Sequence, residues 1–296
     1  MRDINFLKLN ADFTIEENFD FAKHSSIGVG GKAKFAFYPQ NPSQLQELMH
    51  CLETQEVDYI VLGNLTNVLP TDKDIQKAVI CTKKMLESQS GSHNYFSAGI
   101  LSGSLLKTCR VARKSGVEFL AGIPCTLGGA LYMNAGVNGR YIAELVDSVI
   151  VYREGKIISL SQEECAYSYK NSVFMQNKDI ILGAMLSLTD SDEKRIREVE
   201  RSYLERRAHL PKGKSMGCVF KNPNGTNGLS AGAWIEKAGL KGLRQGGAYV
   251  SETHANFIIN EGTAAVQDIC FLIEKIKQEV YKQFQIKLEE EIRYLE

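Results

Sequence analysis

The chain has 296 residues, of which 44% are hydrophobic and 24% are charged, a composition typical of a globular protein with room for two or three domains. Lysine plus arginine and aspartate plus glutamate each total 35, so the net charge is zero and no overall field attracts nucleic acid or a membrane surface. Seven cysteines without a C-x-x-C pair argue against a disulfide framework or a zinc site. We therefore expect a cytoplasmic protein that binds no metal, no nucleic acid and no membrane.

The first part of the chain alternates helical and extended patterns. Residues 3–20 read as a short amphipathic helix, and residues 32–38 alternate as a strand. A proline near its start and leucines at helical spacing predict a helix over 42–55. The apolar run YIVLG at 59–63 predicts a buried parallel strand, which leads into the turn-rich loop GNLTNVLPTD at 63–72.

The stretch FLAGIPCTLGGALYMNAG, residues 119–136, carries no charge and four glycines. Glycine permits positive φ and leaves backbone N–H groups bare, and successive bare amides bind anions such as a diphosphate. Neither a Walker loop nor a Rossmann fingerprint is present. The alternative is a buried glycine-rich turn that crosses between two packed layers.

The rest of the chain reads as a mixed α and β protein. We expect a helix over 102–116, a β-hairpin over 147–161 and further β structure to about Leu188. A highly charged helix follows from about 190 to 210, with Ile196, Val199, Tyr203 and Leu204 as its buried side. Residues 229–284 read as a small α/β module with a helix over 231–242, a strand at 255–260 and a long helix from 264 to 284.

Six motifs occur in an order that resembles one enzyme family. They are GIPCTLGGALYMNAG at 122–136, SYKNSVF at 168–174, GCVFKNP at 217–223, AGLKG at 238–242, SETHANFIIN at 251–260 and EEEIR at 289–293. This order is similar to that of UDP-N-acetylenolpyruvoylglucosamine reductase, a flavoenzyme of bacterial peptidoglycan synthesis, in its shorter subtype. The resemblance covers nearly the whole chain.

The resemblance implies an α+β fold: an FAD-binding fold of the vanillyl-alcohol-oxidase/PCMH type with two α+β subdomains, followed by a C-terminal α+β substrate-binding domain. The boundaries that we expect are 1–85 together with the tail 287–296, then 86–194, and then 195–286. The resemblance also implies FAD and NADPH as cofactors and UDP-N-acetylglucosamine enolpyruvate as substrate. We expect a monomer, although the sequence itself does not give the oligomeric state.

By the same resemblance, FAD is held by one loop after the strand at 59–63 and by the glycine-rich stretch. The expected contacts are Gly63, Asn64, Thr66, Asn67, Gly122, Ile123, Gly128 and Gly129. Two positions depart from the family pattern, since Leu65 and Cys125 stand where glycine is usual. A leucine at positive φ costs roughly 1–2 kcal/mol, so we expect Leu65→Gly to tighten FAD binding.

The catalytic residues that the resemblance implies are Cys218, Glu291 and Lys170. Cys218 occupies the position of the family's proton-donating serine, and a thiol, with an unperturbed pKa of ~8.5, is a stronger acid than an alcohol. Glu291 would protonate or hydrogen-bond the substrate carboxylate, although Glu289 and Glu290 lie beside it. Lys170 replaces an arginine and keeps the charge without the bidentate fork. The alternative for Cys218 is a small buried cysteine.

Tyr169, Lys221, Asn222 and Lys241 are the expected substrate contacts by the same resemblance. Three functions compete. The first is an active NADPH-dependent reductase. The second is a relative that has lost flavin and binds a nucleotide-sugar or a protein partner without turnover. The third is an oxidase of small hydroxylated compounds on the same FAD fold, which would leave the C-terminal motifs without a purpose.

Overall fold

The computed structural model describes residues 14–86, 94–223, 225 and 228–296. Its chain divides into two compact units. Of the described residues, the first contains 14–17, 35–64 and 76–207, and the second contains 18–34, 65–75 and 208–296. The predicted domain boundaries stay predictions, but in this division helix α5 (Glu193–Arg207) belongs to the first unit and residues 287–296 belong to the second.

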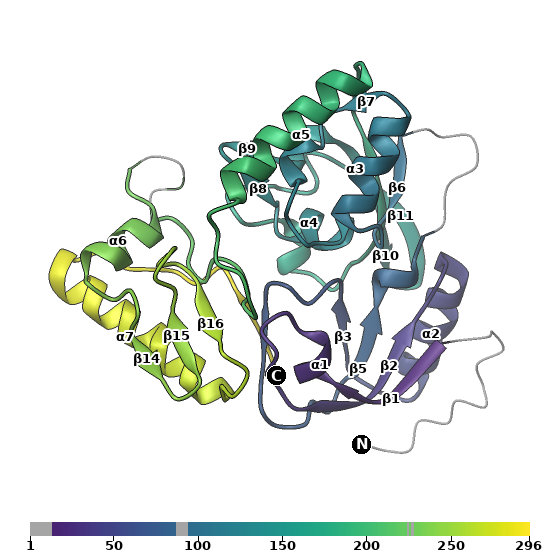
Figure 1. The fold of residues 1–296 in the computed structure, drawn as a ribbon. Helices are drawn as coiled ribbons and strands as arrows, with labels where there is room; N and C mark the ends of the chain where they lie inside the picture. Colours follow the sequence, from purple (N-terminus) through teal and green to yellow (C-terminus); the bar gives the residue numbers. More distant parts are fainter. Residues whose placement is uncertain (1–13, 87–93, 224, 226–227) are drawn as a thin grey trace. The chain divides into compact units, whose positions relative to one another are not determined.

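The α+β class is confirmed, because helices and strands of both sheet types are mixed along the chain (Figure 1). The helices are α1 (Phe21–His24), α2 (Pro42–Thr54), α3 (Ser102–Val111), α4 (Leu127–Tyr132), α5, α6 (Ala231–Lys237) and α7 (Val266–Phe284), with short 3-10 turns η2 (Thr82–Lys84), η3 (Glu118–Leu120), η4 (Ile142–Leu145) and η5 (Val173–Met175). The longer strands are β1 (Thr14–Asp20), β2 (Lys32–Tyr38), β3 (Tyr59–Leu62), β5 (Ala78–Cys81), β10 (Val146–Arg153), β11 (Lys156–Ser161) and β12 (Ile180–Leu186). The shorter ones are β4 (Val68–Pro70), β6 (Tyr95–Ser97), β7 (Lys114–Ser115), β8 (Gly136–Val137), β9 (Arg140–Tyr141), β13 (Thr189–Asp190), β14 (Arg244–Gln245), β15 (Ala248–Val250), β16 (Ile258–Asn260) and β17 (Arg293–Leu295).

Two four-stranded sheets organise the first unit. One has the order β1-β2-β5-β3, in which β5 pairs in parallel with both β2 and β3. The other has the order β11-β10-β12-β6, and its three pairings are antiparallel. Helix α2 buries Leu45, Leu48, Met49 and Leu52 in the core of the first sheet, as its 3.6-residue spacing predicts.

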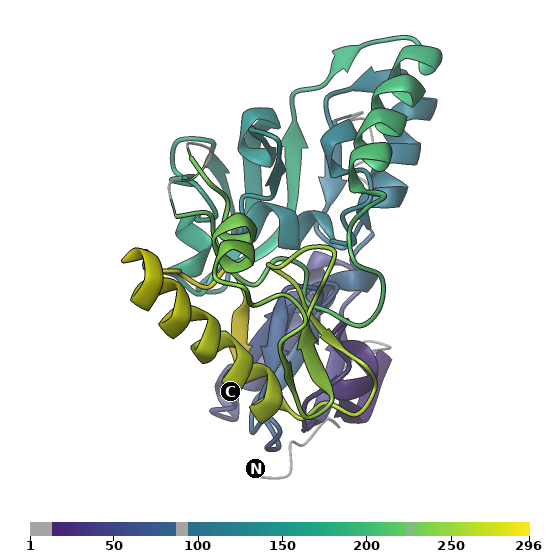
Figure 2. The ribbon, with the colours of Figure 1, turned by 60° about the vertical axis from the view of Figure 1, so that its left-hand side comes forward.

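The second unit contains the antiparallel sheet β14-β15-β16 and the long helix α7, which packs along that sheet in both views (Figures 1 and 2). Apolar residues at helical spacing on α7, among them Ile269, Ile273, Ile276 and Val280, are fully buried in this core. The parallel pair of β17 with β4 also belongs to this unit, so it joins the end of the described chain to residues 68–70.

Several sequence-based expectations were wrong in detail. Helix α3 ends at Val111, five residues before the expected end, and in strand β3 only Leu62 is buried. Residues 14–20 form strand β1 and not a helix, while residues 1–13 lie outside the described ranges. Residues 165–174 form turns and not a strand, because side chains of distant residues bind their backbone. Leu204, which we expected on the buried side of the charged helix, is 50% exposed. Helix α6 ends at Lys237, five residues early, since the chain turns at Gly239 with φ +74°.

In the part of the chain that the structure describes, no helix combines the length and the apolar composition that crossing a membrane requires. All seven cysteines fall within the described ranges, and each is a free thiol.

Candidate active site

The loop Gly63–Asn67 follows strand β3 and contains a leucine in a conformation that favours glycine. Leu65 has φ +51°, in the left-handed region, and its side chain is only 4% exposed. Its carbonyl accepts a hydrogen bond from the Ser26 N–H at 3.1 Å. The backbone conformation that a glycine would adopt freely is thus held by burial of a leucine side chain and by this bond.

The backbone of this loop has donors to offer a ligand. Among the described residues, no protein acceptor receives a hydrogen bond from the N–H groups of Asn64, Leu65 and Asn67. Backbone N–H groups that no protein acceptor uses can bind anions. Within its own unit, each of these N–H groups can donate to an oxygen of the FAD diphosphate.

The glycine-rich stretch uses its backbone differently. The Gly128 N–H donates to the Ala98 carbonyl at 2.8 Å, and the Gly129 N–H donates to the hydroxyl of Thr126 at 3.2 Å. A Cβ on Gly128 would lie 3.1 Å from the Cβ of Ala98, so close packing explains the absence of a side chain at residue 128. The expectation of bare amides was wrong for these two residues; whether they contact FAD stays a prediction.

Two other amides of this stretch are available. Within the described chain, the N–H groups of Gly122 and Thr126 donate to no protein acceptor. Gly122 is exposed and has φ +77°, where a side chain would be strained. The part of the stretch with donors for an anion is therefore its beginning.

The two loops are in contact within the first unit. The Asn64 side-chain amide donates to the Pro124 carbonyl at 2.8 Å. A Cβ on Gly63 would lie 2.4 Å from the hydroxyl oxygen of Thr126, so only glycine fits at residue 63. Residues 63–64 and 124–126 therefore lie side by side, while their joint contact with FAD stays a prediction.

Cys125, the second departure from the family pattern, is built into the loop without strain. Its φ is not positive, and its carbonyl accepts the Ser102 N–H at 2.9 Å. The hydroxyl of Ser102 donates to the neighbouring carbonyl of Ile123. Burial raises the pKa of the Cys125 thiol to about 11, so it is neutral at pH 7.

Lys170 lies in a tight turn. Ser168 and Asn171 exchange two backbone hydrogen bonds of 3.1 Å, and Lys170, the second of the two residues between them, has φ +53°. The Asn134 side-chain amide donates to the Ser168 carbonyl at 2.8 Å, and the Ser172 hydroxyl donates to the Tyr132 carbonyl at 2.7 Å. The end of the glycine-rich stretch thus positions the turn.

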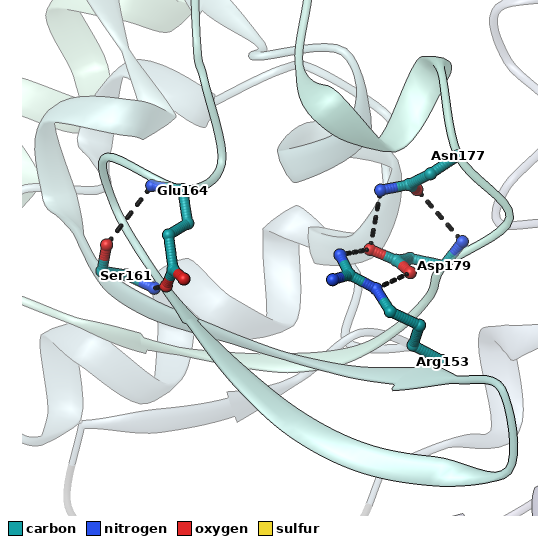
Figure 3. Close-up of polar contacts among 5 residues, drawn as sticks. All are labelled: Arg153, Ser161, Glu164, Asn177 and Asp179. Atoms are coloured by element: carbon teal, nitrogen blue, oxygen red, sulfur yellow. Dashed lines mark hydrogen bonds and ion pairs between the residues drawn. The ribbon is translucent and has the colours of Figure 1, made fainter.

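Polar contacts also fix both ends of the segment that carries this turn (Figure 3). At its start, the Ser161 N–H donates to the Glu164 carboxylate at 2.7 Å and the Glu164 N–H donates back to the Ser161 hydroxyl at 3.3 Å. At its end, the Arg153 guanidinium binds both carboxylate oxygens of Asp179, at 2.7 and 2.6 Å, and the Asn177 amide donates to the same carboxylate at 2.9 Å.

A cavity of about 290 Å³ opens beside the turn. Its lining includes Asn134, Tyr141, Tyr167 and Tyr169, and the rings of Tyr141 and Tyr169 meet edge to face with centroids 6.3 Å apart. Tyr169 was predicted to contact substrate, and the structure places it at a cavity with aromatic walls and polar groups.

The second unit brings the other two predicted catalytic residues onto adjacent segments. The Glu291 N–H donates to the Val219 carbonyl at 2.7 Å, and the Lys221 N–H donates to the Glu289 carbonyl at 2.8 Å. Cys218 and Glu291 are both half-buried. The two motifs, 73 residues apart by their numbers, therefore run side by side.

Asn67, a predicted FAD contact, is bound to the same pair of segments. Its side-chain amide donates to the Glu291 carbonyl at 3.1 Å, and its own carbonyl accepts the Arg293 N–H at 3.0 Å. Residues 65–67 of this unit are thus connected directly to the backbone of the predicted catalytic glutamate.

The remaining predicted substrate contacts have protein partners. The ammonium of Lys221 lies 3.7 Å from the Glu289 carboxylate, and that of Lys241 lies 2.6 Å from Glu236. The Asn222 side-chain oxygen accepts the Ala231 N–H at 3.0 Å, which places Asn222 at the start of α6. Their contact with substrate stays a prediction.

Sequence reasoning missed two asparagines that hold the site in place. Asn256 is 3% exposed and pairs with both the N–H and the carbonyl of Phe220, at 2.9 and 2.8 Å. Asn134 is 4% exposed and binds the Lys170 turn. An asparagine between apolar residues, as in ANF and MNA, was the available signal, because a buried amide needs partners.

Comparison with known protein families agrees with this geometry. The model of the UDP-N-acetylenolpyruvoylglucosamine reductase C-terminal domain matches residues 208–295, and that of an FAD-binding domain matches residues 33–161. The chain is 37% identical to the UDP-N-acetylenolpyruvoylglucosamine reductase of Carboxydothermus hydrogenoformans, over 94% of this chain and 93% of the relative. It is 38% identical to that of Thermosipho melanesiensis, over 97% of each.

A solved structure supports the same conclusion. The chain superposes on the UDP-N-acetylenolpyruvylglucosamine reductase of Thermus caldophilus with a TM-score of 0.83 at 30% identity, over 96% of this chain and all of the other. The predicted FAD-binding fold of the vanillyl-alcohol-oxidase/PCMH type, with a C-terminal domain, is confirmed. These likenesses favour the reductase over the flavin-free binding protein.

Proposed function

Since this chain belongs to the UDP-N-acetylenolpyruvoylglucosamine reductase family and is an FAD-dependent oxidoreductase, we propose that it reduces UDP-N-acetylenolpyruvoylglucosamine to UDP-N-acetylmuramate with NADPH. It does so as a monomer in the cytoplasm, in peptidoglycan precursor synthesis. The observation that carries this proposal is the backbone pairing that holds the Cys218 and Glu291 segments side by side.

FAD, when bound, supplies the hydride that adds to the terminal carbon of the enolpyruvyl group, after taking it from NADPH. The residues that would hold it are Gly63, Asn64, Thr66, Asn67, Gly122, Ile123, Gly128 and Gly129. The N–H groups of Asn64, Leu65 and Asn67, which donate to no protein acceptor in the described ranges, support this assignment.

The protein supplies acid and positive charge. As the terminal carbon gains hydride, negative charge develops on the neighbouring carbon and on the carboxylate conjugated to it. Cys218 donates the proton that completes the reduction and becomes a thiolate. Glu291 hydrogen-bonds the carboxylate, and Lys170 balances its charge. Tyr169, Lys221, Asn222 and Lys241 bind the nucleotide-sugar.

Replacement of Cys218 tests this assignment. In Cys218→Ala, flavin reduction by NADPH stays near the parent rate, while reoxidation by the UDP-enolpyruvyl sugar slows by ~10²–10⁴-fold, the contribution of a positioned acid. In Cys218→Ser, turnover remains measurable, and the alkaline loss of rate moves to higher pH because an alcohol stays protonated. Stopped-flow measurement of both half-reactions checks this. Reoxidation of the alanine variant at the parent rate removes Cys218 from the mechanism.

Lys170 gives a second, independent test. Lys170→Arg preserves or raises turnover, since arginine adds the bidentate fork, and Lys170→Ala slows reoxidation by substrate more than reduction by NADPH. Equal slowing of both half-reactions assigns Lys170 to flavin binding instead of substrate activation.

A further inference from the structure

The last residue of helix α5 lies against the glycine-rich stretch. Arg207 and Gly122 belong to the same compact unit. A Cβ placed on Gly122 would lie 3.1 Å from Nε of Arg207 and 3.3 Å from its Cδ. The Nε atom is shielded from solvent. The guanidinium is therefore held at the exposed backbone of Gly122 and is not a freely solvated charge at a helix end.

The charge of Arg207 also reaches the next turn of the loop. It acts on the Cys125 thiol and favours its ionised form, in opposition to burial. The Arg207 side chain thus lies at Gly122, at the beginning of the stretch, where the N–H groups of Gly122 and Thr126 donate to no acceptor among the described residues.

Backbone donors and a guanidinium in one place make an anion site. A guanidinium is always protonated and binds phosphate oxygens through two parallel N–H bonds, which are stronger than bonds between neutral groups. We propose that Arg207 is a cofactor-binding residue whose guanidinium, with the N–H groups of Gly122 and Thr126, binds the diphosphate of FAD. The inference rests on the use of FAD by this family.

The neighbouring Arg206 provides a matched control. It is exposed, and its guanidinium lies 6.0 Å from the ring centre of Tyr203 on the same helix. It has the same charge as Arg207 and is its neighbour in the sequence, but its side chain lies toward Tyr203 and not toward Gly122. A general loss of positive charge near the end of α5 would affect the two variants equally, whereas a contact with the diphosphate would affect Arg207 alone.

The test measures affinities of the full chain stripped of flavin, by quenching of flavin fluorescence. The ligands are FAD and riboflavin, which has the same ring system without the diphosphate. Arg207→Gln weakens FAD binding by ~10–100-fold, the effect of losing a charge-assisted contact, and leaves riboflavin binding within about threefold. Arg207→Lys recovers part of the FAD affinity, and Arg206→Gln changes neither affinity by more than about threefold.

Each other outcome overturns the proposal. Equal losses for FAD and riboflavin in Arg207→Gln, with a lowered melting temperature, show a structural role for Arg207. Unchanged FAD affinity in Arg207→Gln, while the parent binds FAD, overturns the Arg207 contact and leaves the family function intact. A parent protein that binds neither ligand overturns the use of FAD itself.

Discussion

Sequence patterns single out two loops, 63–67 and 119–136, which we expected to offer backbone N–H groups to FAD. The two loops use their N–H groups differently. The first has one glycine, and the N–H groups of Asn64, Leu65 and Asn67 have no acceptor among the described residues. The second has four glycines, but the fold itself uses the N–H groups of Gly128 and Gly129. Glycine content therefore reports close packing as often as it reports donors for a ligand.

The difference has a physical cause. Gly63 and Gly128 each face another part of the protein, namely the hydroxyl of Thr126 and the methyl group of Ala98. Leu65 instead has φ +51° and buries its side chain. A loop can thus present its amides through backbone conformation alone, provided that burial of a side chain compensates for the strain.

The largest effect is expected at the contact between the loops. Gly63→Ala places a methyl group 2.4 Å from the Thr126 hydroxyl oxygen, which also caps the Gly129 N–H. We expect a loss of about 2–4 kcal/mol in the free energy of unfolding, from overpacking and from the lost cap. Urea denaturation measures it.

Gly103→Ala serves as its control. Gly103 lies in α3 with nothing within 4 Å of its absent Cβ, so alanine is expected to stabilise the protein by up to about 1 kcal/mol. Equal stability of the Gly63→Ala variant and the parent would show that the loops do not depend on this contact.

Leu65→Gly is expected to have the next largest effect. Removing strain at positive φ returns roughly 1–2 kcal/mol, but removing a buried leucine side chain costs about 2–5 kcal/mol. With the side chain 4% exposed, we expect a net loss of about 1–3 kcal/mol and an FAD affinity within about threefold of the parent. This revises the expectation from sequence that glycine would tighten binding. Tighter binding by tenfold or more would restore it.

Alanine variants of two adjacent glycines in the second loop show whether close packing accounts for the absence of a side chain. Gly128→Ala would bring a methyl group within 3.1 Å of the Ala98 Cβ, so we expect a loss of about 1–2 kcal/mol. Gly129→Ala meets only the Thr126 hydroxyl at 3.4 Å, an ordinary contact, and we expect no loss. Thermal unfolding checks whether the Gly128→Ala variant is less stable than the Gly129→Ala variant. The opposite order of stability would contradict this prediction.

The smallest effect concerns the thiol of Cys125. Burial raises its pKa from an ordinary value of 9.0 to about 11, so the folded state favours the protonated form. Its contribution to stability is complete below pH 9 and is lost as the pH rises toward 11. Alkylation of Cys125 by iodoacetamide, followed by mass spectrometry, should be about 10²-fold slower at pH 8.5 than in the unfolded chain. A plateau in this rate near pH 9 would contradict the assignment.

Strong periodic patterns predicted their elements well. The spacing of leucines in 42–55 and of isoleucines in 264–284 correctly identified α2 and α7, because each helix buries one apolar face. Residues 165–174 could not be predicted in this way. Hydrogen bonds from Asn134 and to Tyr132 fix their turns, and those partners lie 34 and 40 residues away in the sequence.

Residues of the candidate site could be proposed from the sequence only where they lie in a motif that resembles the family pattern. Sequence motifs identified Cys218 and Glu291 separately, but the bond between Glu291 and Val219 that aligns their segments has no local signal. The same holds for Arg207, whose contact with Gly122 depends on where α5 ends. Pairings between distant segments follow from the packing of the whole unit and not from the local pattern.

The bond from Asn67 to Glu291 has a consequence for the order of events during synthesis. The two residues are 224 positions apart, so the bond cannot form until nearly all of this sequence has left the ribosome. At ~5–20 residues per second, this delay is roughly 10–45 s after Asn67 is made. Nascent chains arrested before residue 289 cannot form this bond, so we expect them to bind flavin more weakly than chains that extend past residue 291.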